Sequence, residues 1–140
     1  MADCLFCRVV TGDASAHVVL DDGTTVAFLD HRPLFPGHCL LVPRQHYETL
    51  TDLPEELVAP LFSAARRLAR AVETAMGAEG SFVALNNRVS QSVPHLHVHA
   101  VPRRPKDGLR GFFWPRHRYA SEGEAAEVAA RLRSALEGPG

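Results

Sequence analysis

The sequence predicts an α+β fold, a five-stranded antiparallel sheet with one long helix and a short C-terminal helix. Short apolar segments separated by turns recur along the first hundred residues, which is typical of antiparallel strands. One long amphipathic segment stands between the third and fourth of these strands. No G-x-G-x-x-G or P-loop sequence is present, so phosphate binding by those two routes is excluded. With 140 residues, 46% hydrophobic and 22% charged, the chain fits one domain covering residues 1–140.

Five segments are predicted as strands: residues 17–20, 24–29, 38–42, 81–85 and 94–102. Asp21-Asp22-Gly23 joins the first two as a tight turn, so they form a β-hairpin. Residues 30–37 hold two prolines and a glycine and predict a loop, and residues 86–93 predict a second, polar loop.

The long helix is expected to begin after Asp52, with Glu55 three residues later completing a capping box. Pro60 lies too deep for a first-turn proline, so we expect a kink or a break there. Gly77 is the expected C-terminal cap. A final short helix is predicted over residues 121–136, with Ser121 and Glu124 as a second capping box. The apolar stripe of the long helix consists of Leu57, Leu61, Ala64, Leu68, Val72 and Ala75.

Charge and apolar content exclude several classes of partner. The net charge is −1 with histidine neutral, which gives no general attraction to nucleic acid or to a membrane surface. The first residues lack the basic start and apolar run of a signal peptide, and no apolar stretch is long enough to span a bilayer. We therefore expect a cytoplasmic protein without nucleic-acid or membrane partners.

The segment from Pro94 to Pro102 carries histidine at every second position, His95, His97 and His99. Alternation places the three imidazoles on one face of a strand. Three interpretations are open: a catalytic zinc held by three imidazoles, nucleophilic catalysis by one of them, or a plain polar sheet face. The segment 90–92 (Ser-Gln-Ser) upstream and six basic residues between positions 103 and 118 indicate an anionic ligand, which favours nucleophilic catalysis.

Three cysteines, Cys4, Cys7 and Cys39, are too few for a disulfide framework. Cys4 and Cys7 stand at C-x-x-C spacing, which indicates a metal site, a free thiol pair or a redox couple. No thioredoxin-like βαβ pattern surrounds them, which weakens the redox interpretation. Cys39 lies within an apolar strand and is expected in the core.

The segment 95–101 (His-Leu-His-Val-His-Ala-Val) resembles the motif of the histidine-triad (HIT) family, and the likeness extends over residues 4–104. It includes the segments 27–30 (Ala-Phe-Leu-Asp), 36–38 (Pro-Gly-His), 42–46 (Val-Pro-Arg-Gln-His), 86–87 (Asn-Asn), 91–92 (Gln-Ser) and 102–103 (Pro-Arg), in the family's order. The resemblance implies a HIT-like α+β fold with a core at about residues 4–104. Residues 105–140 then form a basic and aromatic tail and the C-terminal helix.

The resemblance also implies an activity, that of a hydrolase or nucleotidyltransferase cleaving at the α-phosphate of an adenine nucleotide. His97 would attack phosphorus to form a nucleotidyl-histidine intermediate, and His99 would contact the phosphate and assist the leaving group. Asp30 would bind the ribose hydroxyls, with a simple turn role as the alternative. Phe6, Phe28 and His31 would contact the base, although the two phenylalanines equally suit the core. The implied nucleotide-binding residues are Asp30, His31, His38, Asn86, Gln91, Ser92, His97 and His99.

In members of the family that carry zinc, the ligands match Cys4, Cys7, His46 and His95 here, which implies a structural zinc. The resemblance separately implies a homodimer, the typical state of the family. Two departures stand out. The loop at residues 88–90 is shorter than the usual glycine-rich version, and residues 107–116 extend beyond the common core. Two other functions remain open, a nucleotide-binding module with little catalytic activity and a zinc hydrolase that uses the triad as ligands.

Overall fold

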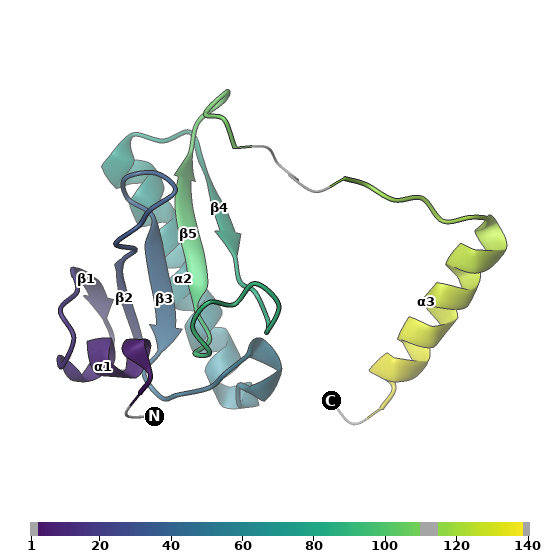
Figure 1. The fold of residues 1–140 in the computed structure, drawn as a ribbon, viewed down its shortest axis with the longest axis horizontal. Coiled ribbons are helices and arrows are strands. Elements are labelled where there is room, and N and C mark those ends of the chain that lie inside the picture. The colour runs from purple at the N-terminus through teal and green to yellow at the C-terminus, as the bar shows by residue number, and fades with distance from the viewer. Residues whose placement is uncertain (1–2, 110–114, 139–140) are drawn as a thin grey trace. The chain divides into compact units, whose positions relative to one another are not determined.

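The computed structural model describes residues 3–109 and 115–138, which divide into two compact units, Met1–Asp107 and Gly108–Gly140. The first unit is a five-stranded antiparallel sheet in the order β1-β2-β3-β5-β4 (Figure 1). Its strands are β1 (Val18–Asp21), β2 (Thr25–Leu29), β3 (Cys39–Pro43), β4 (Gly80–Ala84) and β5 (Val98–Arg103). Its helices are α1 (Leu5–Thr11), the short 3-10 helix η1 (Leu50–Asp52) and α2 (Glu55–Met76). The α+β prediction is confirmed.

The second unit contains α3 (Glu122–Leu136). Its N-cap is Ser121, whose hydroxyl accepts the Glu124 amide at 3.1 Å, as the sequence predicts. Part of the predicted 107–116 segment, residues 110–114, lies outside the described residues. Within the described ranges, no helix is both long and apolar enough to cross a membrane.

Two apolar layers cover the two faces of the sheet. The buried stripe of α2, with Ala64 and Leu68, packs against Leu41, Val98 and Ala100. On the other face, α1 brings Phe6 and Val9 onto β2 and β3, where the partners are Val26, Phe28, Leu40 and Val42. Alternation along the strands decides which side chains face which layer.

The strand register places three residues in one row on the α1 side of the sheet. Phe28 pairs with Leu40 across β2 and β3, and Leu40 pairs with His99 across β3 and β5. The next row, through Leu41 and Val98, belongs to the core beneath α2. His99 therefore lies on the face that α1 covers, and this face carries the candidate site.

Two expectations about the histidine segment and α2 need correction. Regular strand β5 begins at Val98, so His95 and His97 precede the ladder. The alternation still holds, because Leu96, Val98 and Ala100 are all buried in the α2-side core. Of the kink or break expected at Pro60, the break does not occur: α2 is continuous from Glu55 to Met76.

The predicted cap of α2 at Asp52 is wrong. The N-cap is Pro54, without a side-chain bond. The Asp52 carboxylate instead accepts the backbone amide and hydroxyl of Thr49, at 3.1 and 2.7 Å, and so caps the preceding η1. At the other end the prediction is confirmed: Gly77 closes α2 in the left-handed region with φ +58°.

Candidate functional site

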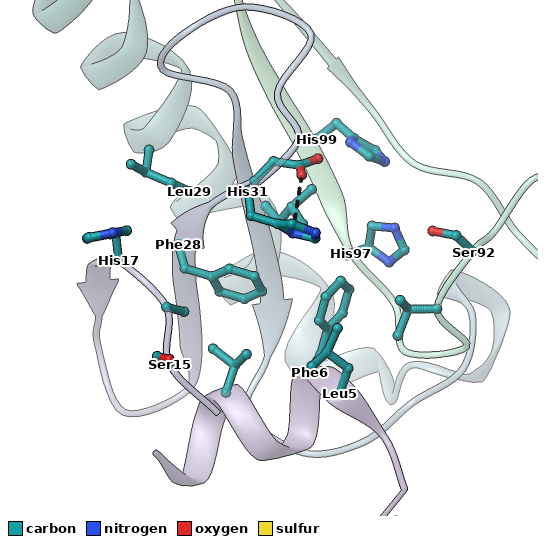
Figure 2. Close-up of a pocket in the computed structure, with 15 residues that line it drawn as sticks. Leu5, Phe6, Ser15, His17, Phe28, Leu29, His31, Ser92, His97 and His99 are labelled. Carbon is teal, nitrogen blue, oxygen red and sulfur yellow. Dashed lines mark ion pairs between the residues drawn. The ribbon is translucent and has the colours of Figure 1, made fainter. Parts of the chain in front are cut away.

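A cavity of about 640 Å³ opens between α1, the end of β2 and the start of β5 (Figure 2). Apolar side chains, including Phe6, Phe28 and Leu40, form its centre. The predicted polar residues that line it are Asp30, His31, Ser92, His97 and His99. The sequence-predicted catalytic pair and part of the predicted nucleotide site therefore share one cavity.

His97 is held in one orientation by the main chain. Its Nδ1 lies 2.7 Å from the carbonyl oxygen of His95, and a carbonyl can only accept, so Nδ1 carries the proton. The lone pair of the neutral ring is then on Nε2. The ring is 5% exposed and packs edge-on to Phe6, with a centroid distance of 5.0 Å. The arrangement provides a nucleophilic nitrogen with a fixed tautomer.

The tautomer of His99 is fixed through a second histidine. The Leu34 amide donates to His38 Nδ1 at 3.0 Å, so the proton of neutral His38 is on Nε2. That Nε2 lies 2.9 Å from His99 Nδ1, which must therefore accept. The proton of His99 is then on Nε2, where it can donate to a ligand in the cavity.

Burial keeps the imidazoles of His38 and His99 uncharged. Burial lowers the pKa of His99 to about 4, with the neighbouring His97 and His38 acting in the same direction. Burial also lowers the pKa of His38, against the opposing influence of Asp30, whose Oδ2 lies 3.7 Å away. The neutral forms required by the hydrogen-bond chain are thus the ones that the site favours at neutral pH.

Asp30 is a turn residue and also lines the cavity. Its Oδ1 accepts the Arg32 amide at 2.9 Å, as a turn residue does. The same carboxylate lines the cavity and lies 4.0 Å from Nδ1 of His31. The side chain of His31 is 83% exposed, so it lies at the rim. Phe6 and Phe28 likewise serve twice, since they are buried in the core and line the cavity.

Three predicted nucleotide-binding residues do not line the cavity: His38, Asn86 and Gln91. His38 lies behind His99, as described above. The Gln91 side chain accepts the Arg88 amide at 2.8 Å and donates to the Glu48 carbonyl at 2.6 Å. Asn86 donates to the Ser90 carbonyl at 3.3 Å. In this structure Gln91 and Asn86 hold the shortened loop together.

The four predicted metal ligands converge next to the cavity. Cys4 Sγ lies 3.4 Å from His95 Nδ1, and Cys7 Sγ lies 3.3 Å from His46 Nδ1 and 3.5 Å from His95 Nδ1. All four donor atoms fall within 4.8 Å of one another. Tetrahedral zinc, with bonds of about 2.1 Å to nitrogen and about 2.3 Å to sulfur, separates such ligands by about 3.6 Å.

The tautomer of His95 also suits a metal. Its Nε2 lies 3.0 Å from the Pro43 carbonyl and must donate to it, which leaves the Nδ1 lone pair facing the two sulfurs. Burial and the neighbouring Cys4 raise the pKa of the Cys7 thiol, so a bound cation would be needed to keep it as thiolate. The residues present fit zinc.

Among the described residues, a second group also has metal-ligating composition, Asp30, His38 and His99. The Leu34 amide argues against a metal there. Because it occupies the Nδ1 lone pair of His38, the Nε2 of that ring carries a proton and has no lone pair to offer. His38 and His99 form a hydrogen-bond chain with the Leu34 amide, and the Asp30 carboxylate lies 3.7 Å from His38 Nε2.

Sequence reasoning missed the short helix α1 and one end of the cavity. Phe6 and Val9, three residues apart, were the available signal for α1, since both face the sheet. Ser15 and His17 also line the cavity, at the side away from His97 and His99 (Figure 2). Nothing in the local sequence pattern marked them.

Comparisons with known proteins agree with this geometry. The model of the HIT domain matches residues 11–106. An adenylylsulfatase of Arabidopsis thaliana is 30% identical over 141 residues, covering 96% of this chain and 70% of its own. An adenosine 5'-monophosphoramidase of Saccharomyces cerevisiae is 29% identical over 117 residues, covering 81% and 71%.

Solved structures share the fold over nearly the whole chain. A HIT family protein from Bacillus subtilis has a TM-score of 0.87 and 31% identity, with 98% of this chain and 99% of that chain covered. A zinc-bound histidine triad family protein from Mycobacterium smegmatis has a TM-score of 0.73 and 36% identity, with 96% and 98% covered. The family match includes the two-histidine chain of His38 and His99, His97, and the two histidines of the cysteine–histidine cluster, His46 and His95. The chain belongs to the HIT domain family.

Proposed function

We propose that this protein is a hydrolase or nucleotidyltransferase that cleaves at the α-phosphate of an adenine nucleotide, such as a phosphoramidate or a dinucleoside polyphosphate. The observation that carries the proposal is the state of His97: its Nδ1–H is bonded to the His95 carbonyl, and its Nε2 lone pair is free beside His99 in the cavity. The Arabidopsis adenylylsulfatase and the yeast adenosine 5'-monophosphoramidase support the same class of reaction.

In the proposed reaction, His97 Nε2 attacks the α-phosphorus and the bond to the leaving group breaks, with its electron pair going to the leaving group. The His99 Nε2–H donates a hydrogen bond to the phosphate or the departing atom. Water then breaks the bond between phosphorus and Nε2, which releases the nucleoside monophosphate and restores His97. Splitting one displacement into two easier steps is what a covalent nucleophile contributes.

The proposed nucleotide lies with its phosphate near Ser92, His97 and His99, and its ribose near the Asp30 carboxylate. Phe6 and Phe28, whose rings meet edge to face at 5.3 Å, form an apolar slot for the base, with His31 at its rim. Asn86 and Gln91 support this site through the loop that they hold, and His38 supports it through His99.

We also propose that Cys4, Cys7, His46 and His95 hold a structural zinc, which is supported by their spacing and by the zinc-bound relative. The bound ion would supply cross-linking and no chemistry. It would join the start of α1, the connection after β3 and the segment leading into β5, which fixes the main chain of His95 and hence the partner of His97. A homodimer in the cytoplasm is proposed as well, on the family resemblance alone.

Single-turnover assays with adenosine phosphoramidate, a dinucleoside polyphosphate and adenylyl sulfate test the activity. We expect an acid-labile nucleotidyl adduct with at least one of them, absent in His97→Ala and retained in Val19→Ala. Nucleotide binding without any adduct would identify a binding module instead.

Metal analysis tests the site. One zinc per chain that is lost in Cys7→Ser but retained in His97→Ala supports the structural role. Zinc that is lost in His97→Ala would identify the triad as the ligand set and overturn the proposed mechanism.

A further inference from the structure

The C-terminal helix α3, labelled in Figure 1, carries an apolar stripe but has no buried residue. Residues that recur every three or four positions share one face of a helix. On α3 these are Ala125, Val128, Ala129, Leu132 and Leu136. Leu132 is 59% exposed and Leu136 is 83% exposed. A helix of 15 residues is marginal in water unless its apolar face packs, so the stripe of α3 needs a partner.

Charged residues border this stripe in a regular order. Because successive residues of a helix are turned by about 100°, Glu124 and Arg131 lie along one edge of the stripe. Glu122 and Arg133 lie along the other edge. On both edges the acid is in the first half of α3 and the base in the second. Within the described part of the chain, none of these four side chains forms an ion pair, and Glu124 accepts the Ala120 amide at 2.9 Å.

A second copy of α3 complements this order of charges when the two helices run antiparallel. A two-fold axis between the helices turns each edge onto itself and brings the basic half of one copy beside the acidic half of the other. Glu124 then meets Arg131 of the second copy, and Glu122 meets Arg133. In a parallel pair, acids would lie beside acids and bases beside bases, which is unfavourable.

The charged and the apolar contacts agree on one register. Both charge pairs are centred between residues 127 and 128. The pairing of Ala125 with Leu132, a small residue opposite a large one, is centred between residues 128 and 129, and Val128 meets its own copy. These centres lie within one residue, about 1.5 Å, of one another along the helix. One antiparallel arrangement therefore covers the stripe and neutralises both of its edges.

We propose that α3 is an interaction surface for a second copy of this chain, with two α3 helices packed antiparallel about a two-fold axis beside Val128. The proposal does not rest on the proposed nucleotide chemistry. It gives the proposed homodimer a contact that is argued from residues of this chain, whereas the homodimer itself was proposed on the family resemblance.

Cysteine cross-linking of the full-length protein tests orientation and register, because two cysteines link only where their Cα atoms come close. After mild oxidation, mass spectrometry of the linked peptides separates the expected links from any through the three native cysteines. Val128→Cys is expected to link to its own copy. Leu132→Cys is expected to link little by itself, but to link when mixed with Ala125→Cys. Ser134→Cys, on the face opposite the stripe, measures links that arise from random collision.

Charge reversal in the Val128→Cys chain tests the edges. Arg131→Glu combined with Arg133→Glu turns four ion pairs across the axis into contacts between like charges, and it is expected to reduce the link roughly 4-fold or more. Mixing this chain with one that carries Glu122→Arg and Glu124→Arg is expected to restore the link. A mixture that stays unlinked would overturn the charge pairing.

Linking of Val128→Cys no stronger than that of Ser134→Cys would overturn the helix pairing, and so would a Leu132→Cys link as strong as that of Val128→Cys, which indicates a parallel pair. Sedimentation equilibrium separates this proposal from the homodimer. A dimer without a link at Val128→Cys overturns the pairing of α3 and leaves the homodimer standing, whereas a monomer overturns both.

Discussion

Replacing His38 by phenylalanine tests whether a hydrogen-bond chain sets the tautomer of His99. The side chain is 3% exposed, and it joins the Leu34 amide, at 3.0 Å, to His99 Nδ1, at 2.9 Å. Phenylalanine fills the space but offers neither a donor nor an acceptor, so both partners lose a part-buried hydrogen bond. Each such bond contributes about 0.5–1.5 kcal/mol, which predicts a loss of about 1–3 kcal/mol in the free energy of unfolding.

The catalytic effect follows from His99. Without its partner, the proton of neutral His99 is no longer confined to Nε2, and the hydrogen bond to the departing group weakens. A barrier increase of about 1–3 kcal/mol corresponds to a fall in kcat of roughly 5- to 150-fold. KM is expected to change little, because His38 lies behind His99 and does not line the cavity.

Three measurements check this: kcat and KM with adenosine phosphoramidate, denaturant unfolding, and ¹⁵N NMR of the His99 ring. Val42→Ala is the matched control, since Val42 is fully buried on β3, the strand that follows His38, and loses only apolar contacts. His38→Asn provides a conservative variant should phenylalanine prevent folding. The reasoning is refuted if the His99 tautomer is unchanged in either variant, or if kcat falls no further than in Val42→Ala.

Other predictions concern pH and the backbone. The folded-state pKa of His99 is lowered to about 4 from a usual value near 6.5, so between these pH values the unfolded chain binds more protons. The free energy of unfolding should therefore fall as the pH falls from 6.5 to 4, and a flat stability profile in denaturant unfolding would contradict this. Ser90 has φ +62°, so Ser90→Gly should raise the free energy of unfolding by about 0.5–1 kcal/mol; a loss would show that the serine is not strained. Gly37→Ala should cost about 2–4 kcal/mol, because φ is +99° and a Cβ would lie 2.6 Å from Met76 Cγ. Gly23→Ala, with φ +86° and open space, should cost only about 1–2 kcal/mol, and an equal cost at both glycines would rule out the Met76 clash.

Sequence patterns predicted the sheet because its signals are local. Turn residues bound the short apolar segments that form the strands, and the alternation of Leu96, Val98 and Ala100 survives even where the ladder has not yet begun. Where sequence reasoning failed, a distant or competing partner decided. Asp52 caps η1 because Thr49 lies within reach, and its spacing to Glu55 does not reveal that.

In the candidate site, too, some features could be predicted from the sequence, and others depend on partners distant in the chain. Side-chain types were sufficient to bring Cys4, Cys7, His46 and His95 together as one ligand set through the family resemblance. They were insufficient for Gln91, whose amide is used by Glu48 and Arg88 in a loop shorter than the family pattern. The place of Ser15 and His17 in the cavity lining depends on how α1 and β2 tether the segment, which no local pattern encodes.

The three histidines of the triad are chemically alike and become different through the main chain. The Pro43 carbonyl holds the proton of His95 on Nε2, so its Nδ1 faces the thiols. The His95 carbonyl holds the proton of His97 on Nδ1, so its Nε2 is free to attack. The Leu34 amide acts through His38 to keep the proton of His99 on Nε2, as a donor. Each tautomer follows from one backbone group, so a substitution that shifts the backbone at one of these points should act first on the tautomer of the imidazole that this group holds.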